Sequence, residues 1–375
     1  MDFDLRAHTV LLAVAGSRAY GLQRPDSDVD VKGVAIPPLS VLTGVWRGFE
    51  QADDVEQIAV FHADLDDVER AAADARGLEG SVYALHKFVR LASECNPHML
   101  DLLWCDEASL RRLSPAGRRL REAAPTFLSL RARHSFGGYA MAQLKRIQGH
   151  RAWLLDPPEK PPIRADFGLP EHTLIPRNQL DAAQAAIDKQ LDRWQLDLDD
   201  LGPARAMAVR ERVSRILAEQ QLGTDAQWTA AARTVGLAEN WIEVMRQERA
   251  YRSARTHYTQ FRAWERSRNP ARAALEAAHG YDTKHASHLV RLLRMALEIL
   301  DEGRVVVWRG DRDADELRAI RDGAWSYDEL LAWSEAQQQR LDDVVARNPC
   351  GLPEGPDRDG LEQLVQDLLG CERYS

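Results

Sequence analysis

The segment from residue 9 to residue 36 constrains the fold more than any other part of the chain. A short β-type apolar run, Thr9 to Ala15, ends at Gly16-Ser17, and a second apolar run, Val29 to Ile36, is stopped by two prolines. Asp28 and Asp30 stand at the start of the second run. Side chains at positions i and i+2 of a strand point to the same face. The segment therefore predicts a strand that directs both carboxylates to one spot.

The residue types in this segment indicate phosphate and metal chemistry. Two carboxylates held side by side repel each other, and a divalent cation is the usual remedy. Hard oxygen ligands with an open side suit Mg²⁺, so Asp28 and Asp30 are predicted metal ligands. Gly16 lets backbone N–H groups approach a phosphate closely, and the Ser17 hydroxyl adds one more donor. An Asp-x-Asp pair alone is a weak signal, and the plain alternative is a polar turn before a strand.

The organisation of the chain changes near residue 125. Before this point strand and helix signals mix, and after it helical periodicity dominates. At 375 residues the chain is long for a single core. We therefore expect an α+β fold with a small mixed-sheet domain over 1–125 and a mainly α-helical domain over 126–375. Within the second domain, residues 172–240 form a candidate insertion or lid.

Composition narrows the class of protein. The formal charge is −9, from 49 basic and 58 acidic residues, which disfavours broad wrapping of nucleic acid but leaves room for a local basic groove. The four cysteines lie far apart without a Cys-x-x-Cys pair, as expected for reduced thiols. The apolar run from Val10 to Ala15 is too short to span a bilayer, and no basic leader precedes it. We expect a cytoplasmic protein without a membrane partner.

The Gly16-Ser17 and Asp28-x-Asp30 pattern resembles the signature of nucleotidyltransferases of the DNA polymerase β superfamily. More narrowly, Gly16-Ser-Arg-Ala-Tyr-Gly-Leu followed by Asp26-Ser-Asp-Val-Asp-Val-Lys-Gly33-Val is similar to predicted nucleotidyltransferases associated with RNA-repair ligases. The downstream matches to the same family are Val82-Tyr-Ala-Leu-His-Lys-Phe88, Asn96-Pro97, Trp264-Glu-Arg-Ser-Arg-Asn-Pro270-Ala-Arg272 and Gly280-Tyr-Asp-Thr-Lys-His285-Ala-Ser-His288-Leu-Val-Arg291. The resemblance implies a polymerase β-like palm followed by a helical part.

The resemblance also implies an activity, namely transfer of a nucleoside monophosphate from an NTP to a hydroxyl with release of pyrophosphate. It implies Mg²⁺ as cofactor and an NTP, with ATP favoured, as donor. An RNA end is the favoured acceptor, while a protein hydroxyl and a small molecule remain open. Gly16 and Ser17 would then cradle the β- and γ-phosphates.

Superfamily members supply a third acidic residue from a later strand, and Glu79 is our candidate because it stands just ahead of a short apolar run. Related sequences carry Asp near this place. Asp54 and Glu56 compete for the role, and each of the three has the plain alternative of a solvent-exposed acid. If the third acid is missing, the alternative is a non-catalytic, nucleotide-binding regulatory module on the same fold. A weaker rival is a structural protein in which Asp28 and Asp30 only cap a turn.

A helix after Gly280 carries a second candidate group. Lys284, His288 and Arg291 are spaced i, i+4 and i+7, so they fall on one side of that helix. They could grip a triphosphate or an acceptor phosphate, with the lysine as a point charge and the arginine as a bidentate fork. The plain alternative is a solvated polar face. His285 and His288 could share a metal by spacing, but Lys284 beside them would repel a cation, so no zinc site is expected.

A basic and aromatic segment lies just upstream of that helix. Its arginines are interleaved with aromatic side chains, a combination that can hold a nucleic-acid strand. The residues are Arg246, Arg249, Arg252, Arg255, Arg262, Arg266 and Arg268 with Tyr251, Tyr258, Phe261 and Trp264. Because the last three aromatics can also pack into a helical core, a structural helix is the favoured interpretation.

Overall fold

The computed structural model describes residues 3–44, 48–173, 178–179, 181–183, 185–186, 228–229 and 232–371. The chain divides into two compact units. Unit 1 combines residues 1–154 with residues 270–375, and unit 2 is formed by residues 155–269. The candidate insertion or lid at 172–240 lies largely outside the described residues, and the domain boundary at residue 125 stays a prediction.

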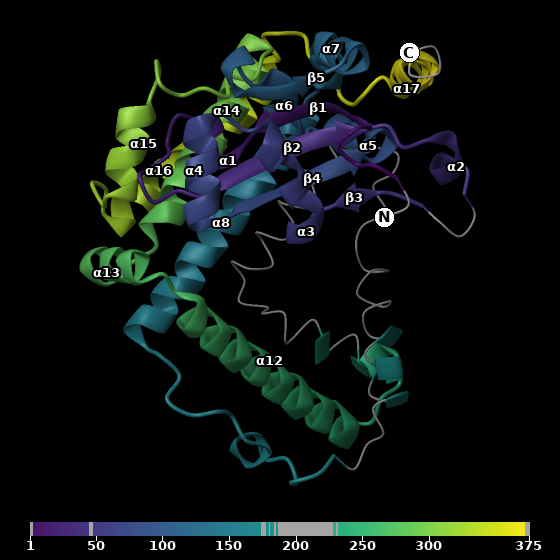
Figure 1. Cartoon of the computed structure of the whole chain (residues 1–375). Helices are drawn as coiled ribbons and strands as arrows, with labels where there is room; N and C mark the ends of the chain where they lie inside the picture. The colour runs from purple at the N-terminus through teal and green to yellow at the C-terminus, as the bar shows by residue number, and fades with distance from the viewer. Residues whose placement is uncertain are drawn as a thin grey trace. The chain divides into compact units, whose positions relative to one another are not determined.

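Unit 1 is built around a mixed five-stranded sheet in the order β3-β4-β2-β1-β5 (Figure 1). Its strands are β1 (Thr9–Val14), β2 (Val29–Ala35), β3 (Gln51–Ala52), β4 (Leu78–Ala84) and β5 (Leu110–Leu113). β1 runs antiparallel to β2 and β5, β3 runs antiparallel to β4, and β2 and β4 are parallel. The small mixed sheet followed by a mostly helical region confirms the predicted α+β class.

Helices connect the strands and then continue to the end of the described chain. Those up to residue 155 are α1 (Gly16–Ala19), α2 (Leu39–Leu42), α3 (Val55–Ile58), α4 (Asp67–Arg76), α5 (Leu85–Ser93), α6 (Pro97–Trp104), α7 (Pro115–Glu122) and α8 (Arg131–Leu155). Short 3₁₀ turns are η1 (Ala59–Asp64), η2 (Glu107–Ser109), η3 (Ala124–Phe127) and η4 (Arg164–Phe167). The later helices are α12 (Glu239–Ser267), α13 (Pro270–His279), α14 (Thr283–Glu302), α15 (Ala314–Arg321), α16 (Tyr327–Arg347) and α17 (Arg358–Cys371).

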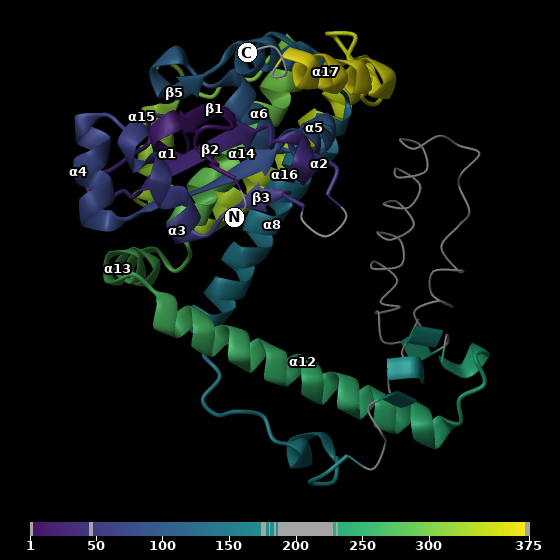
Figure 2. The same ribbon diagram turned by 45° about the vertical axis from the view of Figure 1, so that its right-hand side comes forward.

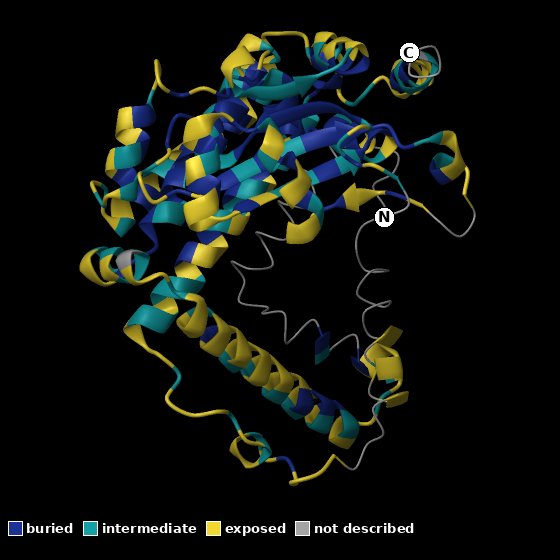
Figure 3. Cartoon of the chain, in the orientation of Figure 1, coloured by how far each residue is buried: buried dark blue, intermediate teal, exposed yellow. Residues whose placement is uncertain are grey.

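The sheet separates two hydrophobic cores, because successive strand residues point to opposite faces. On one face Val29 and Val31 of β2 pack with Phe61 of η1 and with apolar residues of α4. On the other face Leu11 and Val34 join a larger core that includes α5, α6, α14, α15 and α16. Figure 3 shows the central strands β1 and β2 as mostly buried, whereas β5 at the edge of the sheet is of intermediate exposure. Asp30 and Lys32 share the second face with Val34, so the polar start of β2 faces the larger core.

Helix α14 is the central C-terminal element of unit 1. It packs against α15 and α16 and is buried around most of its circumference. Its N-cap is Asp282, whose carboxylate accepts a hydrogen bond from the backbone N–H of His285 at 3.1 Å. Such caps satisfy one of the otherwise unpaired N–H groups of the first turn. The cap fixes the point at which Lys284 enters the helix.

Unit 2 is described mainly by η4 and α12, and Figure 2 shows α12 as one long continuous helix. The first part of α12 is anchored, because the buried Glu248 is paired with Arg164 and the Tyr251 ring lies 5.7 Å from the Phe167 ring. Beyond Arg252 most of its residues are exposed. Among the described helices of the chain, none is both long and apolar enough to cross a bilayer.

Candidate active site

Three carboxylates gather at one edge of the sheet, where β1 ends and the parallel strands β2 and β4 begin. Asp30 on β2 lies directly opposite Glu79 on β4 in the strand register. Opposite residues of neighbouring parallel strands have side chains on the same face. Asp28, just ahead of β2, is exposed, while Asp30 is half-buried. The structure thus brings the predicted third acid beside the predicted metal ligands.

Electrostatics at Asp30 show the cost of this arrangement. Burial raises the pKa of the Asp30 carboxyl, and the negative charges of Asp28 and Glu79 raise it further. The positive charges of Lys32 and Lys284 act in the opposite direction. Carboxylate oxygens that repel one another at an accessible edge are the donor set that suits Mg²⁺. The residues present therefore fit such an ion.

The turn after β1 packs directly on Asp30. Gly16 has φ of 61°, in the left-handed region, and a Cβ at this position would overlap the Asp30 Oδ2 atom. The backbone N–H of Ala15 donates to the carbonyl oxygen of Asp30 at 2.8 Å. The half-buried Ser17 follows in the first turn of α1. A glycine is required here both by backbone geometry and by the nearness of the carboxylate.

C-terminal residues hold the far side of this turn. The Arg318 guanidinium donates to the carbonyl oxygen of Gly21 at 2.5 Å, and Arg24 is paired with Asp322. The backbone N–H of Arg309 donates to the carbonyl oxygen of Tyr20 at 3.2 Å. The loop between β1 and β2 is therefore fastened by residues nearly 300 positions further along the chain.

The predicted group on α14 divides into two parts. Lys284 and His288 are half-buried, whereas Arg291 is only 5% exposed. Burial lowers the pKa of Lys284, and the charges of Asp28 and Asp282 oppose this shift. Since Lys284 also acts on Asp30, it lies close enough to the carboxylates to share their electrostatic field. This side of α14 faces protein rather than bulk solvent.

Arg291 takes part in a buried network under the Gly16 turn. Its guanidinium lies 3.7 Å from the centre of the Tyr20 ring, and the Tyr20 hydroxyl donates to the carboxylate of Asp101 on α6. Asp101 is 7% exposed, and its Oδ1 atom has no hydrogen-bond partner. A cavity of about 10 Å³ lined by Gly16, Tyr20 and Asp101 is large enough for about one water molecule. Arg291 thus packs against Tyr20 and helps to hold the turn that carries Gly16 in place.

Two residues near the carboxylates were missed at the sequence level. Lys32 follows Asp30 by two positions on the same strand face, and burial lowers its pKa while Asp101 and Asp30 oppose that shift. The same i, i+2 alternation that paired Asp28 with Asp30 would have found it. Asp101 has no comparable signal, because only tertiary packing of α6 brings it to Lys32.

Asp54 and Glu56, the competing candidates for the third acid, lie at the start of α3. Asp54 caps α3 by accepting a hydrogen bond from the Glu56 backbone N–H at 2.9 Å, and both residues are exposed. Glu79 is among the charges that act most strongly on Asp30, and Asp54 and Glu56 are not. Position in the sheet favours Glu79 for the third acid.

A second polar cluster surrounds the N-cap of α14. His150, Asp282 and His285 place their potential ligand atoms within 4.8 Å of one another. His150 Nδ1 lies 3.1 Å and His285 Nε2 lies 3.6 Å from Asp282 Oδ2. Arg272 is paired with the same oxygen, so a metal ion there would have to displace a guanidinium. An ion-pair network that fixes the start of α14 explains the cluster better than a cation site.

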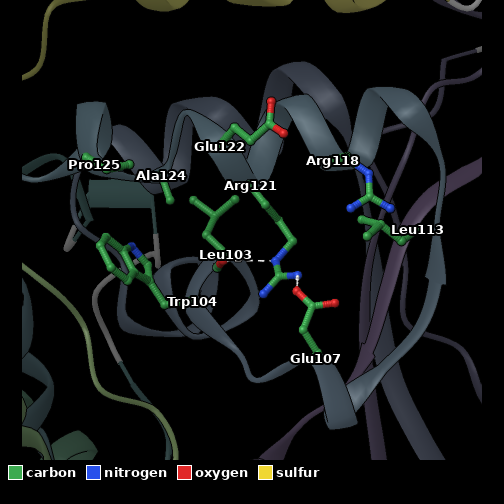
Figure 4. Close-up of a pocket in the computed structure, with 9 residues that line it drawn as sticks. All are labelled: Leu103, Trp104, Glu107, Leu113, Arg118, Arg121, Glu122, Ala124 and Pro125. Carbon is green, nitrogen blue, oxygen red and sulfur yellow. Dashed lines mark hydrogen bonds and ion pairs between the residues drawn. The ribbon is translucent and has the colours of Figure 1, made fainter.

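A separate hollow of about 400 Å³ lies between α6 and α7 (Figure 4). Arg121 spans it, donating to Glu107 Oε1 at 2.6 Å and to the carbonyl oxygen of Leu103 at 3.3 Å. None of its lining residues belongs to the carboxylate edge. The hollow between α6 and α7 is therefore separate from the candidate active site.

Comparison with known proteins gives one match. Residues 4–153 match the model of a family described as the RNA repair pathway DNA polymerase beta family. No curated protein and no solved structure matches the chain. The matched stretch contains the Gly16-Ser17 turn and all three carboxylates, and it ends before α14.

Proposed function

We propose that the chain is a Mg²⁺-dependent nucleotidyltransferase, because residues 4–153 match the model of the RNA repair pathway DNA polymerase beta family. It moves a nucleoside monophosphate from an NTP to a hydroxyl acceptor and releases pyrophosphate. The observation that carries the proposal is the register of Asp30 with Glu79, next to Asp28 and under the Gly16 turn. Asp30 lies opposite Glu79, and Asp28 and Glu79 both act electrostatically on Asp30, so the three acids stand at one edge of the sheet.

Each residue has a role in the proposed reaction. Asp28 and Asp30 would hold the ion, which when bound would supply neutralisation of phosphate charge and activation of the acceptor hydroxyl. Glu79 completes the ligand set or accepts the hydroxyl proton. The backbone at Gly16 and the Ser17 hydroxyl donate hydrogen bonds to the β- and γ-phosphates. Positioning and electrostatic stabilisation supply most of the rate enhancement in such transfers.

The basic residues near the edge complete the donor site. Lys284 and Lys32 counter the charge of the triphosphate from the face covered by α14, and His288 lies one turn further along the same helix. Arg291 acts indirectly, since it is buried against Tyr20. ATP is the favoured donor. An RNA end is the favoured acceptor, in keeping with the description of the matched family.

The proposal is tested by pyrophosphate release from each of the four NTPs with Mg²⁺, with and without RNA. Asp28→Asn and Asp30→Asn are each expected to reduce release by roughly 10³-fold or more, as is typical when a residue of a concerted catalytic group is removed. Asp54→Asn, which alters an exposed helix cap, is the matched control and should keep normal turnover. Far-ultraviolet circular dichroism should be unchanged in all three variants.

Normal turnover by Asp30→Asn would reject the assignment. Release that needs Asp30 but not RNA would direct the search to protein or small-molecule acceptors. NTP binding that requires Mg²⁺ but yields no pyrophosphate would favour the non-catalytic regulatory module.

A further inference from the structure

Four arginines form a row along the outer part of α12. Arg252, Arg255, Arg262 and Arg266 are all exposed. At 3.6 residues per turn they fall within roughly 80° of one another around the helix, and they span about 21 Å along it. We call these four residues the arginine row. In a chain with a formal charge of −9, this is a strong local departure from the average charge.

The acids near the arginine row are exposed and leave it available. Arg252 lies 3.5 Å from Asp181, and Arg262 lies 2.5 Å from Glu265. Both acids are more than 40% exposed, and ion pairs of this kind contribute little to stability because water screens them. The contrast is Arg164, whose partner Glu248 is buried and whose role is structural. The arginine row can therefore exchange its partners for another anion.

Aromatic side chains border the row. Tyr251 and Tyr258 lie next to it on the helix wheel, and both are half-buried. Tyr251 is already engaged by the Arg164 guanidinium at 5.4 Å and by the Phe167 ring at 5.7 Å, whereas the Tyr258 ring lies 6.4 Å from the Phe261 ring and keeps part of its surface exposed. Basic side chains that follow a backbone, with aromatic rings beside them, are the recurring arrangement of single-strand binding surfaces. The alternative that all of these residues only build a helical core does not fit the exposure of the four arginines.

We propose that the arginine row of α12 binds the sugar–phosphate backbone of single-stranded RNA, with Tyr258 stacking on a base. Guanidinium forks suit phosphate because they can donate two parallel hydrogen bonds to it. Single-stranded RNA is favoured over an acidic protein because the aromatic border adds a surface for bases, and because the matched family is described by RNA repair. That this RNA is the acceptor rests on the proposed function, whereas the binding itself does not.

Binding is measured by fluorescence anisotropy of a labelled single-stranded RNA of roughly 16 nucleotides, at several salt concentrations, with the full chain. The test variant combines Arg255→Gln, Arg262→Gln and Arg266→Gln. The matched control combines Arg233→Gln, Arg304→Gln and Arg347→Gln, three exposed arginines elsewhere with the same change in charge. A third variant carries lysine at the three positions of the row.

The test variant should lose about 10-fold or more in affinity at low salt, and its log–log salt slope should be shallower by about 2, because each lost phosphate contact removes roughly 0.7 from the slope. The control should bind like the wild type, and the lysine variant should retain most of the affinity. Anisotropy is measured without NTP and Mg²⁺, so RNA binding is scored independently of pyrophosphate release, which separates this inference from the catalytic one.

Three outcomes would overturn the proposal: no RNA binding by the wild type, equal losses in the test and control variants, or displacement of RNA by polyglutamate as effectively as by unlabelled RNA. The last result would assign the row to acidic proteins.

Discussion

At the scale of single residues, Gly16 and Asp30 share one small volume at the end of β1. The positive φ of Gly16 turns the chain, and the missing side chain leaves room for the Asp30 carboxylate. Position 16 must both adopt a positive φ and leave space for the Asp30 carboxylate. It should therefore tolerate substitution less well than a glycine that only has a positive φ. A left-handed conformation alone costs a non-glycine residue about 1–2 kcal/mol.

Gly16→Ala should therefore lose far more activity than stability, because the new methyl group has to displace Asp30. Pyrophosphate release and thermal unfolding, measured on the same preparations, separate the two effects. Gly303→Ala is the matched control, since Gly303 has φ of 65° but its nearest neighbour would be in ordinary contact at 3.6 Å. Similar activity in the two variants would show that Gly16 does not position Asp30.

Asp30 itself should destabilise the folded protein when no metal is present. Its pKa is raised in the fold, chiefly by burial and by Asp28, so ionisation at neutral pH costs more in the folded than in the unfolded state. Asp30→Asn is expected to raise the Tm of the metal-free protein at pH 7. The difference should shrink as the pH falls through the raised pKa, because the wild type is then protonated as well.

Mg²⁺ with an NTP should raise the Tm of the wild type and leave that of Asp30→Asn nearly unchanged, since a ligand stabilises only the state it binds. Differential scanning calorimetry measures both effects: the Tm difference between the metal-free proteins at pH 7 and at pH 4.5, and the Tm rise on adding Mg²⁺ and an NTP at pH 7. A lower Tm for metal-free Asp30→Asn would mean that the carboxylate has a structural partner.

At the scale of elements, α14 carries polar residues through an apolar core. Its N-cap Asp282 is fully buried, and burial alone would raise the pKa of this carboxyl. The hydrogen bond from His150 and the charges of His285 and Arg272 outweigh burial and hold the pKa below its ordinary value. The stability that Asp282 contributes is thus present at neutral pH and lost in acid. Lys284, two residues later, depends on this anchor for its position.

Asp282→Ala should lower the free energy of unfolding by about 3 kcal/mol at pH 7, because it removes both the cap of α14 and the buried carboxylate that pairs with Arg272. Asp282→Asn should cost less, since an asparagine oxygen can still cap the helix. Urea unfolding at pH 7 measures both losses. Equal stability of the alanine variant and the wild type would show that the network contributes nothing.

Local sequence patterns were sufficient for the elements of the site but not for all of its contacts. The apolar run Val29 to Ile36 predicted the strand that carries Asp30, and the helical spacing after Gly280 predicted α14. That Asp28 and Asp30 converge on one metal ion stays a prediction. Asp30 pairs with Glu79 because β2 and β4 are parallel neighbours, and this contact, with 48 residues between its two partners, leaves no trace in the local sequence. Asp101 reaches Lys32 in the same non-local way, through the packing of α6.

At the scale of the whole molecule, the sequence order of the elements was predictable and their grouping was less so. Mixed strand and helix signals followed by helical periodicity gave the α+β class, because both are local properties of the chain. That residues 270–375 join the sheet in one compact unit is a long-range property. Because α14 joins this unit, Arg291 is buried, and spacing along a helix cannot show which neighbour will cover a side chain.

The inclusion of α14 and α15 in the unit of the sheet has a consequence for synthesis on the ribosome. When residue 154 has emerged, α14, α15 and α16 have not yet joined α5 and α6 in the larger core, and the loop at Gly16 lacks Arg318. The ribosome must add a further 115 residues of unit 2 before unit 1 resumes. At 5–20 residues per second this delay lasts roughly 10 s. During that time the larger core lacks α14 to α16 and the Gly16 loop lacks its contacts with Arg309 and Arg318, so we expect the site to take its final form only after residues 270–321 have been made.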